Sequence, residues 1–127
     1  MRANFEKKIL TLKPDIALSG KTEKEIIIMA SLIEGEAKGD ADREIISGIL
    51  WRRITIGMPL QVDVALTTYK TKGLPNSPIN NPGLEALKAA IYPKSSSYLY
   101  YLHDKKGVIH YAKSFNEHQK NVLKYLK

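Results

Sequence analysis

The sequence contains no cysteine, which excludes disulfide bridges, cysteine nucleophiles and thiolate metal sites. It has no run of about 18 apolar residues, the length that a membrane-spanning helix needs. It does not open with the charged and then apolar segment of a signal peptide, and it contains no internal repeat or low-complexity stretch. With 127 residues, 43% of them hydrophobic and 26% charged, the chain is predicted to form one globular unit.

Acidic residues are few beside basic ones, 13 against 20, which gives a formal net charge of +7. This charge favours an anionic partner such as nucleic acid, a membrane surface or an acidic polymer. The lysines are scattered, with no run of five or more, so a solubilising surface is the simpler interpretation. Because no recognition-helix motif or basic, aromatic-lined face is identifiable, nucleic-acid binding is disfavoured.

Capping residues and apolar spacing predict a mainly helical α+β fold. A first short helix is expected over residues 3–12. It stops before Pro14, because the residue before a proline is driven out of the helical region, and "PDIALSGK" then forms a connection. Thr22 and Glu25 match a capping box that opens a second helix. That helix is expected to run to about Lys38 and to end at Gly39 in the left-handed conformation.

A third helix is expected over residues 41–56, with Asp40 as its N-cap and Gly57 ending it. Its apolar stripe is predicted to face the core, and its charged residues are predicted to face water. The stripe consists of Ile45, Ile46, Ile49, Leu50 and Ile54, and the charged set of Arg43, Glu44, Arg52 and Arg53.

Residues 58–82 are rich in proline, glycine and asparagine and are expected to be irregular. Asn81 and Pro82 suit the N-cap and first position of a short helix, "GLEALKAAI", that closes before Pro93. The segments "YLYYLH" and "VIHYAK", joined by "DKKG", predict a β-hairpin with Gly107 at positive φ. Residues 114–117 form a second capping box that opens a C-terminal helix.

Two glutamates, Glu34 and Glu36, follow an almost wholly apolar run in "ASLIEGEAK". On a regular helix, residues two apart point about 200° away from each other, so these carboxylates cannot share one site. Glu36 lies over apolar residues and near the negative end of the helix dipole, and both surroundings are expected to raise its pKa, as a general acid requires. Glu34 has Lys38 four residues on as an ion-pair partner. On the pattern alone, two ordinary surface glutamates at a frayed helix end are also possible.

Several segments together resemble the catalytic core of the endolytic murein transglycosylase (MltG, YceG-like) family. They cover roughly residues 24 to 126 in the family's order. The resemblance is carried by the Glu-x-Glu helix, the turn "R-x-x-x-G-M-x-L-Q-x-D", "G-L-P", "N-P-G" before a short helix, and "E-H-x-x-x-V" near the end. It implies a lysozyme-like, mainly helical catalytic domain with a C-terminal hairpin and a final helix.

The family resemblance implies a lyase that cuts the MurNAc–GlcNAc β-1,4 bond within peptidoglycan strands without water and leaves 1,6-anhydroMurNAc ends. It places the catalytic glutamate at Glu36 and makes Glu34 a supporting residue. No metal or other cofactor is implied. The implied partners are peptidoglycan glycan strands and the cell wall synthesis machinery.

Other residues match the family's pattern and are candidates for binding substrate or supporting the acid. Each also has a structural interpretation: turn chemistry for Gln61 and Asp63, an N-cap for Asn81, packing for the histidines, and core positions for some of Tyr98, Tyr100 and Tyr101. The spacings of His103, His110 and His118 match no zinc pattern. The candidate supporting residues are Glu34, Gln61, Asp63, Tyr69, Asn81, His110 and His118.

The sequence departs from the family's pattern in one loop. "QVDVALTTY" is shorter than usual, with Val64 in place of a proline and Thr67 in place of an asparagine. A catalytically impaired peptidoglycan-binding module is therefore the alternative function. The resemblance further implies one catalytic domain over residues 1–127, with an N-terminal helix and connection (1–21) and a core (22–127). It would be excised from a longer protein anchored in the cytoplasmic membrane and facing the cell wall.

Overall fold

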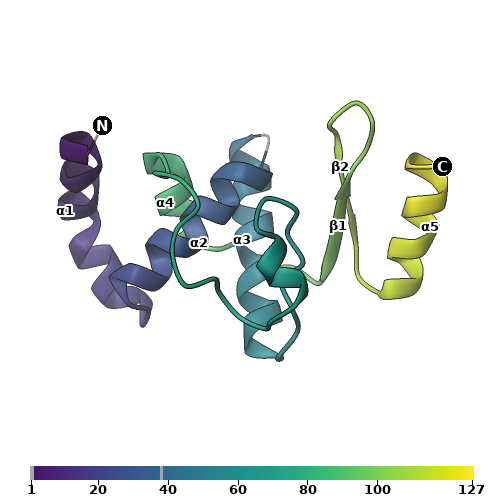
Figure 1. Cartoon of the computed structure of the whole chain (residues 1–127), viewed down its shortest axis with the longest axis horizontal. Helices are drawn as coiled ribbons and strands as arrows, with labels where there is room; N and C mark the ends of the chain where they lie inside the picture. Colours follow the sequence, from purple (N-terminus) through teal and green to yellow (C-terminus); the bar gives the residue numbers. More distant parts are fainter. Residues whose placement is uncertain (1, 38) are drawn as a thin grey trace.

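A computed structural model describes residues 2–37 and 39–127. Within this part of the chain the fold is α+β, mainly helical, with one two-stranded antiparallel sheet. Figure 1 shows the hairpin standing between the group of helices α1–α4 and the last helix, α5. The elements are α1 (Arg2–Ser19), α2 (Glu23–Glu36), α3 (Asp40–Thr55), the 3₁₀ helix η1 (Leu66–Tyr69), α4 (Leu84–Ile91), β1 (Tyr100–His103), β2 (Ile109–Ala112) and α5 (Phe115–Tyr125).

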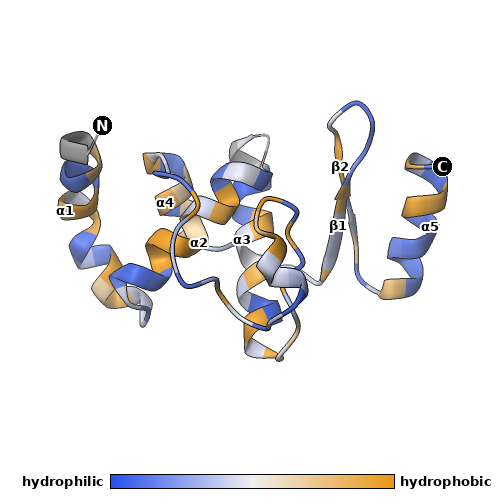
Figure 2. Cartoon of the chain, viewed as in Figure 1, coloured by the Kyte–Doolittle hydropathy of each residue, from blue (hydrophilic) through white to orange (hydrophobic). Residues whose placement is uncertain are grey.

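The hydrophobic core is built around α2, which contacts α1, α3 and α4. Ile26, Met29, Leu32 and Ile33 of this helix are fully buried, as its apolar sequence predicts. Figure 2 shows hydrophobic residues along α2 at the centre of the helical group. None of the described helices combines the length and the hydropathy that crossing a membrane requires.

The first helix is longer than predicted, because it continues through Pro14 and the expected connection to end at Ser19. A proline inside a helix costs about 3 kcal/mol. Ile9, Leu12 and Ile16 recur on one face and are buried against the core, and burying such side chains contributes roughly 1.5–3 kcal/mol each. Core packing therefore outweighs the local cost at Pro14, whose own ring faces solvent.

The capping box at Thr22 is confirmed: its side chain accepts from the amide of Glu25, and the Glu25 carboxylate accepts from the amide of Thr22. The end of this helix differs from the prediction, because α2 stops at Glu36. Gly39 has an extended φ of −154° and is the N-cap of α3, so it does not terminate α2 in the left-handed conformation, and Asp40 begins α3 instead of capping it. Tertiary contacts of Glu36, described below, hold the end of α2 at this position.

Residues 58–82 are irregular apart from η1, as expected, but α4 begins later than predicted. Its N-cap is Gly83, so Asn81 lies two residues before the cap and is exposed. The amide of Gly83 donates to the carboxylate of Glu34 on α2, at 2.7 Å. An acceptor from another helix therefore takes the place that a local asparagine was predicted to fill.

Gly48 in α3 determines how closely the segment after α4 approaches this helix. The amide of Lys94 donates to the carbonyl of Glu44, at 3.0 Å. A Cβ atom at position 48 would lie 2.1 Å from the carbonyl oxygen of Lys94, so only glycine permits this approach. The contact fixes the segment that leads into the hairpin.

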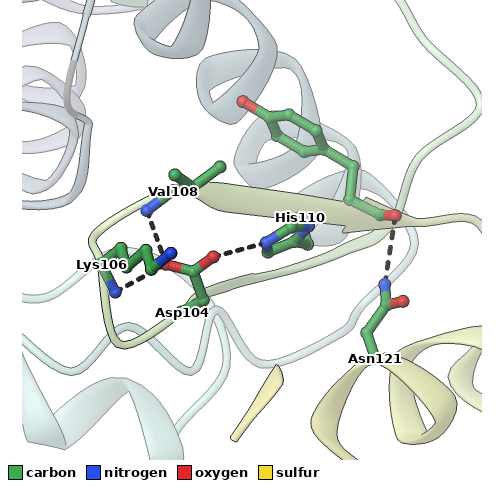
Figure 3. Close-up of polar contacts among 6 residues, drawn as sticks. Asp104, Lys106, Val108, His110 and Asn121 are labelled. Carbon is green, nitrogen blue, oxygen red and sulfur yellow. Dashed lines mark hydrogen bonds and ion pairs between the residues drawn. The ribbon is translucent and has the colours of Figure 1, made fainter. Parts of the chain in front are cut away.

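The hairpin has the predicted turn, with Gly107 at φ 85° and Tyr101 of β1 opposite Tyr111 of β2. Figure 3 shows that the carboxylate of Asp104 accepts from the amides of Lys106 and Val108 across the turn. Ser114 caps α5 by accepting from the amide of Glu117, which confirms this N-cap, and α5 packs on both strands.

Candidate active site

A cleft of about 340 Å³ lies where the end of α2, the loop before η1, β1 and α5 meet. Helix α2 contributes Glu36, and the loop and η1 contribute Gln61, Asp63 and Tyr69. The wall formed by β1 and α5 is largely apolar and aromatic. It includes Tyr100, Tyr101, Leu102, Phe115 and Val122, together with Leu126, which follows α5 as its C-cap.

Glu36 is buried, with 7% of its surface exposed, although it borders the cleft. The hydroxyl of Tyr101 donates to its Oε1 at 2.7 Å, and Nε2 of His103 donates to its backbone carbonyl oxygen at 2.6 Å. The first bond orients the carboxyl group, and the second satisfies a carbonyl that the end of α2 leaves without a helical partner. Strand β1 therefore fixes both the side chain and the backbone of Glu36.

Tyr101 remains a hydrogen-bond donor throughout the working pH range. Burial raises the pKa of its hydroxyl well above the usual value of 10, and the nearby charge of Glu36 and the hydrogen bond to it raise this pKa further. Sequence reasoning did not single out Tyr101 or His103 as neighbours of Glu36. The sequence did indicate that the two side chains share a face, because residues two apart on a strand point to the same side.

Arg53 is buried, which corrects the prediction that it faces water. Its Nε donates to the carbonyl of Leu99 at 2.9 Å, and its Nη1 donates to the carbonyls of Pro59 and Leu60 at 3.3 and 2.8 Å. These backbone acceptors explain why the guanidinium leaves water, and burial lowers its pKa. Arg53 thus ties the loop after α3 to the segment before β1, beneath the cleft.

Hydrogen bonds within residues 61–68 hold the loop that carries Gln61 and Asp63. Gln61 has φ 54°, and within the described residues it is the only non-glycine residue at positive φ. Thr68 holds the loop from inside, because its hydroxyl accepts from the amide of Val62 and donates to the carbonyl of Ala65. The loop therefore presents Gln61 and Asp63 at the cleft in a strained but well-supported turn.

The hydroxyl of Tyr69 donates to Oδ1 of Asp63, which fixes both side chains at the rim of the cleft. Burial and this hydrogen bond raise the pKa of Tyr69 to about 12. The loop also lies against α2 at Gly35, where a Cβ atom would stand 2.9 Å from Cγ1 of Val64. The glycine between the two glutamates thus allows the loop to reach the cleft.

Glu34 and Glu36 lie apart, as the helical geometry predicted. Glu34 is exposed, and its Oε1 accepts from the amide of Gly83 at the start of α4. The expected partner, Lys38, lies outside the described residues. Glu34 therefore has a structural contact away from the cleft.

The two candidate histidines, His110 and His118, lie in different places relative to the cleft. His118 lines the cleft and stacks on Tyr100 at 5.2 Å, and its Nδ1 is buried without a hydrogen-bond partner among the described residues. Burial, and then the charge of Arg53, lower the pKa of His118. His110 lies outside the cleft lining, where its Nε2 donates to Asp104 at 2.8 Å (Figure 3).

The remaining candidates also include residues that line the cleft and residues that do not. Asn81 is exposed and is not part of the cleft lining. Of the three tyrosines, Tyr98 stacks on Tyr111 at 5.2 Å, whereas Tyr100 and Tyr101 line the cleft. Among the predicted site residues the cleft therefore brings together Glu36, Gln61, Asp63, Tyr69 and His118, and their roles stay predictions.

The fold and this cleft define a mainly helical domain in which a buried carboxyl group stands at a cleft wall. Comparisons with known proteins identify its family. The model of the YceG-like family matches residues 1–67 and 65–124, so the chain belongs to this family. The crystal structure of a YceG-like protein from Listeria monocytogenes superimposes with a TM-score of 0.82 at 30% identity, over 88% of this chain and 44% of that one. The two matched segments of the family model overlap at residues 65–67, where η1 begins.

Two of the curated relatives that the chain matches carry the name endolytic murein transglycosylase. The protein from Bacillus subtilis is 31% identical over 138 residues, which covers 91% of this chain and 38% of the relative. The protein from Streptococcus pneumoniae D39 is 26% identical over 154 residues, which covers 99% of this chain and 28% of the relative. The chain thus spans about a third of the length of these relatives.

Proposed function

We propose that this chain is the catalytic part of a lytic transglycosylase that cuts the MurNAc–GlcNAc β-1,4 bond inside peptidoglycan strands. The observation that carries the proposal is the carboxyl group of Glu36, which is buried, is oriented by Tyr101 and belongs to a residue that lines the cleft. A carboxyl group in such surroundings is suited to hold a proton near neutral pH and to release it to a bound substrate. The names of the relatives support murein as the substrate.

One carboxyl group suffices for this reaction. Glu36 first protonates the glycosidic oxygen, and the bond from that oxygen to C1 of MurNAc breaks. The C6 hydroxyl of the same sugar then attacks C1 and gives its proton to the Glu36 carboxylate, which restores the acid and leaves a 1,6-anhydro end. Hydrolytic glycosidases need a second carboxylate to activate water or to attack C1, and a transglycosylase does not.

The walls of the cleft support the choice of anhydro product over hydrolysis. Tyr100, Phe115 and Val122 present apolar surface beside the acid, which disfavours a water molecule in position to attack C1. Gln61 and Asp63, which line the same cleft, offer polar groups for sugar hydroxyls. We further propose that residues 1–127 act as one catalytic unit within a longer, membrane-anchored protein that works on the cell wall with the synthesis machinery. The net charge of +7 suits an anionic wall.

The test is digestion of purified peptidoglycan, with the products identified by mass spectrometry. The unmodified chain is expected to produce anhydro ends, and Glu36→Gln is expected to lower the rate roughly 10²–10⁴-fold, the usual contribution of a general acid. The matched control is Asp63→Asn, a change of the same kind at the other carboxylate of the cleft, which is expected to keep anhydro products at a reduced rate. Reducing ends that depend on both carboxylates would instead indicate a hydrolase.

A peptidoglycan-binding module is the second candidate, because the family model matches the chain as two segments that overlap at residues 65–67, close in sequence to the cleft residues Asp63 and Tyr69. Sedimentation of the folded protein with insoluble peptidoglycan separates the two. Binding by both the unmodified chain and Glu36→Gln, with no product from either, would establish a module that has lost catalysis.

A further inference from the structure

A second groove, of about 530 Å³, lies along α5 and adjoins the candidate active site. Phe115, His118 and Val122 line both this α5 groove and the cleft that contains Glu36. These three residues follow one another at three- and four-residue spacing, so they form one stripe on the helix. The groove and the cleft therefore meet along this stripe. The residues that line the groove and not the cleft are Asn116, Gln119, Lys120 and Leu123.

The surface of α5 that carries the groove is open. The helix packs on β1 and β2, and none of its residues, all of which the structure describes, is fully buried. Figure 1 shows α5 at the end of the molecule, with the hairpin on one side of it. Phe115 and Leu123 have 56% and 66% of their surface exposed. An exposed apolar patch beside a ligand cleft is typical of a binding surface.

We propose that the α5 groove binds the glycan strand where the strand continues beyond the bond that is cut. The inference rests on the proposed function, in which the cleft holds that bond. A strand that is cut in its interior has to leave the cleft on both sides of the bond. The stripe that the cleft and the groove share provides one of these two exits.

The side chains of the α5 groove match the chemistry of a glycan. A pyranose ring presents a face of C–H groups, which is complementary to the apolar surfaces of Phe115 and Leu123. The edge of the ring carries hydroxyl and acetamido groups. Asn116 and Gln119 each offer both donors and an acceptor to such groups. Apolar walls with a few polar side chains are usual in ligand sites.

The charge of this region favours the same ligand. MurNAc carries a carboxylate on its lactyl group, or on the peptide that is attached to that group. Among the described residues that line the α5 groove, Lys120 carries the one permanent charge. Residues 113–127 contain four lysines and one glutamate. The groove therefore attracts an acidic polymer.

The experiment measures the binding of two soluble glycans by isothermal titration calorimetry. They are a tetrasaccharide and an octasaccharide of alternating GlcNAc and MurNAc without peptides. All proteins carry Glu36→Gln, so that neither glycan is cut during the titration. The octasaccharide is expected to bind roughly fivefold more tightly or better, because it reaches both the cleft and the α5 groove.

Three variants change side chains that line only the groove. Leu123→Ser and Gln119→Ala are each expected to reduce the advantage of the octasaccharide to about twofold or less and to leave the affinity for the tetrasaccharide unchanged. Lys120→Glu is expected to act in the same way at low salt and more weakly at high salt, because salt screens exposed charges.

Two matched controls make the same kinds of change elsewhere: Leu18→Ser on α1 and Lys105→Glu in the hairpin turn. Leu18 is 87% exposed, Lys105 is exposed, and neither lines the cleft or the α5 groove. Both controls are expected to keep the full advantage of the octasaccharide. Circular dichroism checks that each variant is folded, as its exposed position predicts.

Folded groove variants that bind the octasaccharide as tightly as the controls do would overturn the inference. An equal loss of affinity for both glycans would also overturn it, because the effect would then lie in the cleft. Sedimentation velocity tests for another occupant of the groove. Concentration-dependent association that Leu123→Ser abolishes, with unchanged glycan affinity, would assign the groove to contacts between copies of the chain and overturn the inference.

The two proposals fail in different ways. An unmodified chain that forms no anhydro product but binds the octasaccharide through α5 contradicts the proposed function alone. A chain that cuts peptidoglycan with Glu36, but whose glycan binding does not depend on the α5 groove, contradicts only the role of the groove.

Discussion

Replacement of Gly35 by alanine tests how closely the loop at the cleft depends on the residue between the two glutamates. The new Cβ atom would stand 2.9 Å from Cγ1 and 3.2 Å from Cγ2 of Val64. Ordinary carbon contacts lie at roughly 3.5–4.0 Å, so the valine has to retreat by about half an ångström or more. Valine is stiff at χ1, and the loop backbone therefore has to move with it.

The effect of Gly35→Ala on stability is expected to be small. Alanine gains about 1 kcal/mol over glycine in a helix, and overpacking costs about 1–3 kcal/mol. The free energy of unfolding should therefore fall by no more than about 2 kcal/mol. Urea unfolding followed by circular dichroism measures this change.

The effect on catalysis is expected to be larger, because the displaced loop carries Gln61 and Asp63 at the cleft. A misplacement of about 1 Å costs on the order of 100-fold, so half that distance predicts roughly a tenfold loss of anhydro-product formation. Adding Val64→Ala to Gly35→Ala removes the atoms in conflict and is expected to restore the rate to within about twofold of Val64→Ala alone. A folded Gly35→Ala variant with an undiminished rate, or a double variant as slow as the single one, would refute the reasoning.

Two further predictions concern contacts outside the cleft. Glu34→Gln removes the negative charge at the N-terminus of α4, where the Glu34 carboxylate accepts a hydrogen bond from the amide of Gly83. The free energy of unfolding is expected to fall by about 0.5–1 kcal/mol at low salt, and turnover is expected to stay within about twofold of the unmodified chain. A loss of turnover as large as that of Glu36→Gln would contradict the structural role. The hydrogen bond from His110 lowers the pKa of Asp104 in the folded chain, so the stability that the ionised carboxylate contributes is complete above its unfolded pKa and is lost as the pH falls through its folded pKa. The difference in unfolding free energy between the unmodified chain and Asp104→Asn should therefore shrink between about pH 5 and pH 2. A difference that does not depend on pH would contradict this prediction.

The features that the sequence predicted correctly are those determined by near neighbours in the chain. The capping box at Thr22, the cap at Ser114 and the positive φ of Gly107 depend on contacts within four residues. Each has a strong local preference, and nothing in the tertiary structure opposes it.

The incorrect predictions are those in which a distant contact overrode a local preference. Pro14 stands inside a helix because that helix buries its apolar face against the core. Asn81 is not a cap because Glu34 of another helix supplies the acceptor at Gly83. Arg53 is buried because carbonyls from two separate segments meet its guanidinium. None of these partners is identifiable from the neighbouring sequence.

The candidate site was partly accessible from the sequence. Helical geometry separated Glu34 from Glu36, and the family resemblance pointed to Glu36, whose catalytic role stays a prediction. The partner of its carboxyl group, Tyr101, lies 65 residues further along the chain. Alternation along β1 groups Tyr101 with His103, but only the fold brings that face to the end of α2.

The long separation between Glu36 and its partners also sets the order in which the site is completed during synthesis. Residues up to Ile91 contain helices α1–α4 and nearly all of the buried core. The residues that orient Glu36 and form the far wall of the cleft come from β1 and α5, which leave the ribosome later. A nascent chain therefore contains the acid and most of its hydrophobic core well before it has a cleft in which that acid is oriented.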